Sequence, residues 1–333
     1  MLPLTAIAAL LRCPRCRSAL AETGGSCSNP ACGMHFERAG RQPILIDASN
    51  SIVYPASIEL AIESRGGPLR RLLDRLGEQN RVAPDVSEKI RAELVARTHG
   101  RRPIVLVVGG GSIGSGIDSL YDDPAIDLIG FDVYPSRHTQ FVADGHAIPL
   151  ADSSVDAVVI QAVLEHVRDP ARVVAEIHRV LRADGLIYAD TPFLQHVHEG
   201  PFDFTRFTES GHRWLFRHFE LIESGHVAGV GAGLCWSIAH VAQHRAAARR
   251  QSARTPGDAP TRDARRPADL AATRDRRRVE RLLLRPALGD AARRPRNDRA
   301  LSRHAGEADP AARVAAVTPG RTIASRSRAR TSP

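Results

Sequence analysis

Four of the five cysteines fall in one short stretch near the N-terminus, as Cys13-x2-Cys16 and Cys27-x4-Cys32. Two closely spaced pairs on short turns can bring four thiolates to the corners of a tetrahedron, the arrangement that Zn²⁺ prefers. Four sulfur ligands leave no open coordination position, so such a zinc ion would hold the fold together and do no chemistry. Disulfides, iron or a site that has lost its metal are the alternatives, and no surrounding βαβ pattern supports a thioredoxin-like redox motif.

A second group of reactive side chains lies between residues 191 and 219, where histidines, acids and arginines alternate with phenylalanines. Such a segment can form a substrate pocket with aromatic walls. His198 or Asp203 would then act as the base, and Arg206 would orient an anion or Asp203. The structural alternative is a hydrogen-bonded loop that fixes the next helix, with Thr208 as its N-cap. Both interpretations stay open at the level of sequence.

A third group is a glycine cluster that directly follows the aliphatic run 104–108, which is typical of a strand buried on both faces. A second apolar run, 126–131, ends on Asp132. Glycines let the backbone turn sharply and let a ligand approach closely, and an acid at the tip of the second strand can bind two ribose hydroxyls. The pattern predicts the first βαβ unit of a nucleotide-binding sheet, and its spacing alone suits NAD and S-adenosylmethionine equally.

The elements that must position these groups continue in the order of an α/β sheet. Residues 155–160 and 186–189 are predicted strands, and the helix between them starts at Asp169-Pro170, where proline costs no hydrogen bond. Open α/β sheets bind ligands at the carboxyl ends of their strands, which is where the segment 191–219 begins. Upstream, residues 57–98 show helical spacing of leucines and of Ile90, Leu94 and Val95, with Gly77 and Pro84 separating two helices.

Taken together, residues 103 to about 225 resemble the class I S-adenosylmethionine-dependent methyltransferases. The resemblance implies a Rossmann-like, mostly parallel sheet and an enzyme that uses S-adenosylmethionine. The cysteine segment likewise resembles the zinc ribbons found fused to or paired with methyltransferases, with residues 43–46 as the closing strand. The motifs that carry the main resemblance are Ala143-Asp144-Gly145, Ile148-Pro149-Leu150, Val155-Asp156-Ala157-Val158, Leu164-Glu165-His166-Val167 and Glu176-Ile177-x-Arg179-Val180-Leu181-x-x-Asp184-Gly185.

The resemblance also implies residue roles on the cofactor side. By motif, the cofactor-binding residues would be Gly109 and Gly111 beside the methionine part, Asp132 at the ribose, Asp144 at the adenine amino group and Gln161 near the sulfonium. The family often carries an acid two residues before the first glycine, where this chain has Val107. The contact to the cofactor's amino group must therefore come from backbone carbonyls or another side chain.

On the acceptor side, a His-x-x-Pro-x-Asp-Phe-x-Arg-x-Thr segment that starts at His198 is similar to segments of related methyltransferases whose acceptors are often unknown. The catalytic candidates are accordingly His198, Asp203 and Arg206. In the family the position of Glu165-His166 is a loop beneath the cofactor, which favours a structural over a catalytic role for that pair.

Charge is distributed unevenly. Residues 241–333 hold 23 arginines, no lysine and nine acids, a net charge of +14, which leaves −5 for the first 240 residues. An acidic body favours a small-molecule or sugar-containing acceptor over RNA, because RNA binding needs a basic face. An rRNA or tRNA methyltransferase, a non-catalytic binding module and an NAD-linked oxidoreductase are the alternatives.

Location and organisation follow from composition. No apolar stretch approaches the ~20 residues that span a bilayer, and the N-terminus is unlike a signal peptide, so we expect a cytoplasmic protein without a membrane partner. The predicted parts are a zinc ribbon (1–50), a helical connector (51–100), the methyltransferase domain (101–245) and an Arg/Ala/Pro-rich tail (246–333). The tail is predicted to be disordered or frameshifted, or an arginine-rich arm, because the expected closing strand pair is not visible after Gly233.

Overall fold

The computed structural model describes residues 1–21, 24–53, 83–98, 100–198, 202–227, 233–234, 236–238, 240–242 and 245, and the backbone of 321–326. Most of the predicted connector, including its first helix, and nearly all of the predicted tail lie outside these residues. The described part contains the four clustered cysteines, the glycine turn and most of the segment 191–219. The candidate functional residues of all three groups can therefore be located relative to one sheet.

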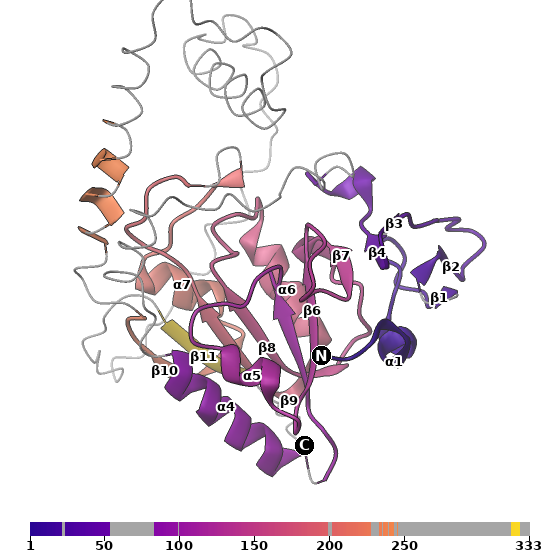
Figure 1. The fold of residues 1–333 in the computed structure, drawn as a ribbon, viewed down its shortest axis with the longest axis horizontal. Helices are drawn as coiled ribbons and strands as arrows, with labels where there is room; N and C mark the ends of the chain where they lie inside the picture. The colour runs from indigo at the N-terminus through magenta and orange to yellow at the C-terminus, as the bar shows by residue number, and fades with distance from the viewer. Residues whose placement is uncertain are drawn as a thin grey trace, which may run out of the picture. The chain divides into compact units, whose positions relative to one another are not determined.

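In the described part of the chain, nine strands form a single sheet in the order β10-β11-β9-β8-β5-β6-β7-β4-β3 (Figure 1). Its centre is parallel, which confirms the predicted Rossmann-like sheet. The central strands are β5 (Ile104–Val108), β6 (Asp127–Asp132), β7 (Phe141–Ala143), β8 (Val155–Gln161) and β9 (Leu181–Asp190). The glycine turn thus follows the middle strand, and Asp132 is the last residue of its neighbour.

One edge of the sheet closes with an antiparallel pair. Strand β11 (Arg321–Arg326) lies between β9 and β10 (Phe219–Ser224), and it runs antiparallel to both. Its backbone places Arg321 opposite Asp190 and Ser325 opposite Leu186. The closing strand pair that the sequence did not reveal after Gly233 is therefore present, and one of its strands comes from the segment assigned to the tail.

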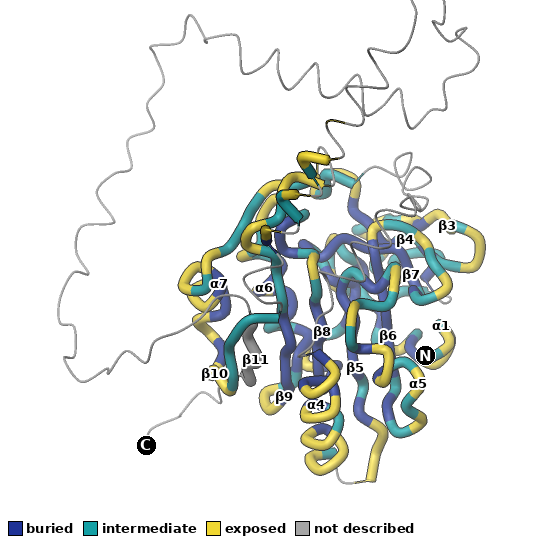
Figure 2. The backbone as a smooth tube through the Cα atoms, turned by 60° about the vertical axis from the view of Figure 1, so that its left-hand side comes forward, coloured by how far each residue is buried: buried dark blue, intermediate teal, exposed yellow. Residues whose placement is uncertain are grey.

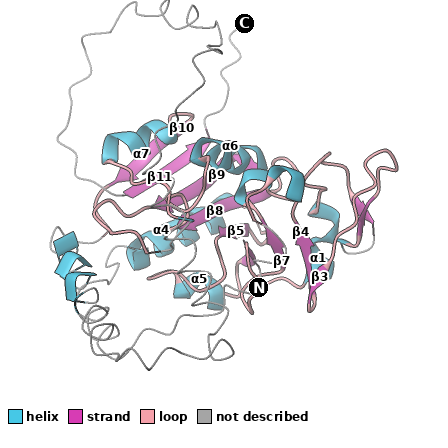
Figure 3. Cartoon of the chain, turned by 90° about the horizontal axis from the view of Figure 1, so that it is seen from above, coloured by secondary structure: helices cyan, strands magenta, loops and turns pink. Residues whose placement is uncertain are grey.

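Both faces of the sheet are buried, because its strands alternate apolar residues between two cores (Figure 2). Val105 and Val107 belong to one apolar cluster, whereas Leu106 and Val108 belong to the other. Helices α4 (Ala83–Arg97) and α5 (Asp118–Asp122) cover the first face, and α6 (Pro170–Val180) and α7 (Glu209–Leu215) cover the second (Figure 3). None of the helices in the described part of the chain has the length and apolar character that a bilayer crossing requires.

The second connector helix differs from its prediction in one detail. Ile90 and Leu94 are buried as expected, but Val95 is exposed, because it lies one position beyond the buried stripe of α4. Pro84 occupies the first turn of α4, where its missing N–H leaves no hydrogen bond unmade, and the helix predicted before it lies outside the described residues.

The cysteine-bearing region is built from short elements. They are α1 (Leu4–Ile7), η1 (Ala8–Leu10), β1 (Leu20–Ala21), β2 (Ser26–Cys27), β3 (Arg38–Ala39), β4 (Gln42–Leu45) and η3 (Ala48–Asn50). Strand β4 pairs in parallel with β7, Ile44 opposite Val142, so this region extends the central sheet. Leu11 and Phe36 belong to the same buried cluster as the strands of the sheet. The predicted ribbon and the predicted methyltransferase domain therefore share one core.

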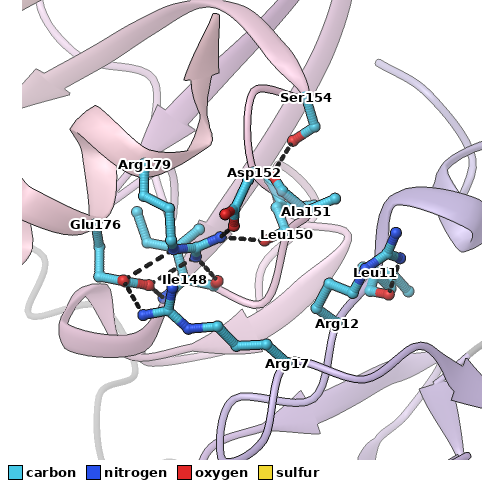
Figure 4. Close-up of polar contacts among 10 residues, drawn as sticks. All are labelled: Leu11, Arg12, Arg17, Ile148, Leu150, Ala151, Asp152, Ser154, Glu176 and Arg179. Carbon is cyan, nitrogen blue, oxygen red and sulfur yellow. Dashed lines mark hydrogen bonds and ion pairs between the residues drawn. The ribbon is translucent and has the colours of Figure 1, made fainter.

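A polar network also joins the two regions (Figure 4). Glu176 on α6 is buried and accepts hydrogen bonds from Arg17 at 2.8 Å, from Arg179 at 2.7 and 2.9 Å, and from the Ile148 N–H at 3.0 Å. Arg179 donates further to Asp152 and to two backbone carbonyls. Because Glu176 is shared between Arg17 and Arg179, it fixes the cysteine region against α6.

Candidate active site and metal centre

The four clustered cysteines converge on one point. Their sulfur atoms all lie within 4.8 Å of one another, with Cys13 and Cys32 3.8 Å apart and Cys16 and Cys27 3.4 Å apart. These separations exclude S–S bonds, which are ~2.05 Å long. They match sulfur atoms on one tetrahedral ion, which lie about 3.8 Å apart when the Zn–S bonds are ~2.3 Å. The thiol set fits a structural zinc ion.

The turn behind the last cysteine has the geometry that such a centre needs. Gly33 has a φ of +60°, a left-handed conformation that glycine adopts without strain. The Asn29 N–H donates to the Cys27 sulfur at 3.4 Å. Hydrogen bonds from Ser18 lower the pKa of Cys16 to about 6, so this sulfur is readily a thiolate.

The glycine turn after β5 is tightly covered by side chains that follow two other strands, β6 and β8. Gly109 has a φ of +76°, and a Cβ built there would come within 2.2 Å of the Val163 side chain. A Cβ on Gly111 would come within 2.4 Å of the Tyr134 ring. Both positions require glycine here, as the sequence predicts, and the close cover by Tyr134 and Val163 was not predicted.

Asp132 lies directly beside this turn. One carboxylate oxygen accepts from the Gly111 N–H at 2.8 Å and the other from the Val133 N–H at 2.7 Å. The side chain is nearly fully buried, and this burial raises the pKa of Asp132 to about 6 despite the two backbone donors. Each carboxylate oxygen can accept a further hydrogen bond, so the pair suits a diol.

Asp144 follows β7 and caps the short helix η4 (Gly145–Ala147). One of its oxygens accepts from the His146 N–H at 3.0 Å and from its Nδ1 at 2.6 Å, while the other accepts from the Ser51 hydroxyl. Burial alone would raise the pKa of Asp144, but the hydrogen bonds from His146 and Ser51 hold it below its ordinary value. His146 Nε2 accepts from the Asp169 N–H at 3.1 Å, so Nδ1 carries the proton.

A polar cavity of about 290 Å³ lies beside Asp144. Its lining includes His146, which contacts Asp144, and Ser51, which directly follows the cysteine region in the sequence. The remaining lining residues are Asn50, Ile52, Arg168, Asp169 and Arg172. The predicted adenine side of the site therefore has open space next to it.

Gln161 ends β8 and reaches over the glycine turn. Its amide donates to Asp190 at 3.0 Å and to the Ser115 carbonyl at 3.3 Å, and its oxygen would lie 2.0 Å from a Cβ on Gly114. The next residue, Ala162, has a φ of +51°. A left-handed alanine is uncommon and is held here by the pairing of its N–H with the Asp190 carbonyl at 3.1 Å.

The predicted acceptor residues form a rigid loop. Arg206 and Asp203 pair through two hydrogen bonds of 2.6 and 3.0 Å, and Arg206 also donates to the carbonyls of Gln195 and His196. Burial opposes ionisation of Asp203, yet the bonds from Arg206 and from the His198 N–H keep its pKa below the ordinary value. This pair fixes the loop, and the Thr208 side chain caps α7 as the structural alternative predicts.

Comparison with known proteins supplies the family. Residues 64–189 match the sequence model of a family described as a methyltransferase domain. The matched residues include the glycine turn and strands β5 to β8, so this part of the chain is similar to methyltransferase domains. A 45-residue stretch is 53% identical to a Mycobacterium tuberculosis protein named as a probable S-adenosylmethionine-dependent methyltransferase, and it covers 14% of this chain and 16% of that one. The methyltransferase match thus spans about a sixth of the curated relative.

Solved structures similar to this part of the chain include two methyltransferases. A SAM-dependent methyltransferase from Aquifex aeolicus is 15% identical, with a TM-score of 0.33, over 47% of this chain and 91% of that one. The CurJ carbon methyltransferase is 12% identical, with a TM-score of 0.37, over 50% of this chain and 56% of that one.

The structure brings most of the predicted site residues of the methyltransferase domain to the carboxyl ends of the parallel strands. Gly109, Gly111, Asp132 and Gln161 meet at the turn after β5. Asp144 lies two strands away and is already engaged by Ser51. The sequence missed Ser51, Tyr134 and Val163, because each contributes through a contact between distant segments that no local motif marks.

Proposed function

We propose that this chain is an S-adenosylmethionine-dependent methyltransferase with a small-molecule or sugar-containing acceptor. The observation that supports it most is the Asp132 carboxylate, buried beside the glycine turn, fixed by the N–H groups of Gly111 and Val133, and with acceptor capacity to spare on both oxygens. A ribose diol is the ligand that this arrangement suits. Asp144 would receive the adenine amino group, and the turn from Gly109 to Gly111 would border the methionine part.

S-adenosylmethionine supplies a methyl group on a sulfonium, which is transferred by in-line displacement. The main task of the protein is to hold the acceptor and the methyl group in line, which supplies on the order of 7–11 kcal/mol. A base adds roughly 10²–10⁴-fold where the acceptor is a hydroxyl. His198 suits that role better than Asp203, because Asp203 already accepts two hydrogen bonds from Arg206.

Under this proposal the cysteine cluster holds a structural Zn²⁺. The support is the separation of its sulfur atoms and the absence of an open ligand position among four thiolates. The ion would fix the region that carries β4 and Ser51, and it would lie apart from the chemistry of methyl transfer. The small-molecule assignment draws its support from the net charge of −5 on residues 1–240.

Calorimetric titration with S-adenosylhomocysteine tests the proposed function. We expect the wild type to bind, Asp132→Ala to lose most of its affinity, and Asp127→Ala to bind normally, since Asp127 starts the same strand at its opposite end. Incubation with labelled S-adenosylmethionine should then label a small-molecule fraction and not RNA. A folded Asp132→Ala variant with unchanged affinity would place the cofactor elsewhere.

A further inference from the structure

A second potential metal site lies at the end of β8, outside the cysteine cluster. Glu165 is fully buried, and among the described residues neither of its carboxylate oxygens has a hydrogen-bond partner. Its backbone carbonyl accepts from the N–H groups of Phe204 and Thr205 at 2.8 and 3.2 Å, so the acceptor loop holds it in place. A buried carboxyl group in this state either holds a proton or has a positive partner, such as a metal ion.

Two imidazoles lie next to this carboxylate. His166 Nδ1 is 2.8 Å from the Phe202 carbonyl, and His198 Nδ1 is 3.1 Å from the His196 carbonyl. A carbonyl only accepts, so both Nδ1 atoms carry protons and both Nε2 atoms are of the kind that binds metal ions. Backbone carbonyls that orient the far nitrogen of an imidazole are typical of histidine ligands.

The separations suit a shared ion. His166 Nε2 lies 3.6 Å from the nearer Glu165 oxygen, which is too long for a hydrogen bond. Two ligands on one tetrahedral ion with ~2.1 Å bonds are about 3.4 Å apart. One ligand atom from each of Glu165, His166 and His198 lies within 4.8 Å of the other two, so small side-chain adjustments would bring all three onto one ion.

We propose that Glu165, His166 and His198 bind a divalent transition-metal cation, with Zn²⁺ as the probe. Two imidazoles and one carboxylate favour such a cation over Mg²⁺ or Ca²⁺, which prefer oxygen ligands. Asp190 and Asp203 add negative charge near Glu165 and outweigh the positive charge of Arg206. Three protein ligands leave at least one position for water or an acceptor oxygen, and the assignment makes His198 a ligand instead of a free base.

The test is the zinc content of the full-length protein, loaded with Zn²⁺, desalted and measured by mass spectrometry. We expect Glu165→Gln and His198→Gln each to hold one Zn²⁺ fewer per chain than the wild type. The zinc content of each variant is compared with that of the wild type. Because the cysteines are unchanged, any zinc that they bind contributes equally to both and cancels. His196→Gln is the matched control and should equal the wild type, because it changes a histidine on the same loop but keeps the carbonyl that His198 uses.

Retention of the wild-type zinc content by either variant overturns the three-ligand site. Because His198 is partly exposed, the His198→Gln variant should fold even where Glu165→Gln does not. Circular dichroism shows whether a variant that holds less zinc is folded or unfolded. The readout needs neither S-adenosylmethionine nor an acceptor. A failed metal site therefore leaves the methyltransferase proposal intact, and a failed methyltransferase proposal leaves the metal site intact.

Discussion

Cofactor affinity should depend on pH through Asp132. Burial raises the pKa of this carboxyl group from 3.8 to about 6, so near pH 5 the empty protein holds it mostly protonated. Ribose hydroxyls donate hydrogen bonds to the charged form, and such donors lower the pKa in the complex. Binding at acidic pH must therefore expel a proton, and we expect affinity for S-adenosylhomocysteine to fall as the pH drops below 6.

The magnitude follows from the fraction of ionised Asp132. With a pKa of about 6, roughly a tenth of the molecules are ionised at pH 5 and nearly all are ionised at pH 7.5. The apparent Kd should therefore be roughly tenfold weaker at pH 5. Because the pKa of Asp132 is raised from 3.8 to about 6, the empty protein is about 3 kcal/mol more stable toward unfolding below pH 3.8 than at neutral pH. This extra stability is lost as the pH rises through 6.

Calorimetry at pH 5, 6 and 7.5, in buffers of different ionisation enthalpy, measures both the affinity and the proton count. We expect the wild type to release close to one proton per ligand at pH 5 and almost none at pH 7.5. Asp132→Asn cannot ionise, so its binding should be weak and independent of pH. A wild-type affinity that is equal at pH 5 and 7.5 would refute the assigned role of Asp132.

Three further outcomes are expected. Glu176→Ala should lower the free energy of unfolding by about 3–5 kcal/mol in urea titrations, because it removes the buried carboxylate to which Arg179 and the Ile148 N–H donate. Arg17→Ala should cost less than about 1 kcal/mol, because the Arg17 side chain is half-exposed. Ala162→Gly should raise the melting temperature slightly, because the left-handed φ of 51° suits glycine; the expected gain in the free energy of unfolding is under about 1 kcal/mol. Chelation should lower the melting temperature of the wild type but change that of Cys16→Ser much less, if the thiolates hold zinc.

Local sequence signals predicted the parts of the fold that depend on neighbouring residues. The apolar run 104–108 is a strand buried on both faces, and α6 starts at Asp169-Pro170 as predicted. The Thr208 side chain caps α7, as one of the two open interpretations of that segment predicted. These outcomes need only side-chain periodicity and the hydrogen bond from an N-cap residue. The position of Asp132 at the tip of β6 belongs to the same class, because it follows directly from the end of an apolar run.

Contacts between distant segments could not be read from the sequence in this way. The six residues of β11 are mostly polar and lie more than a hundred residues from β9, so no local period marks them as a strand of the sheet. Val95 differs from Ile90 and Leu94 only by the side of α4 on which it falls. Glu165 was expected to be structural, and only the folded loop shows that its carboxylate has no hydrogen-bond partner among the described residues.

The order of the strands gives the cysteine region a direct connection to the cofactor side. Because β4 pairs with β7, the chain leaves the cysteine region beside the residue that follows β7, which is Asp144. Ser51 then donates to one Asp144 oxygen, and His146 occupies the other. An adenine amino group that binds Asp144 must share or displace the Ser51 contact. The position of the cysteine cluster therefore sets the geometry of the proposed adenine subsite, even though no cysteine reaches it.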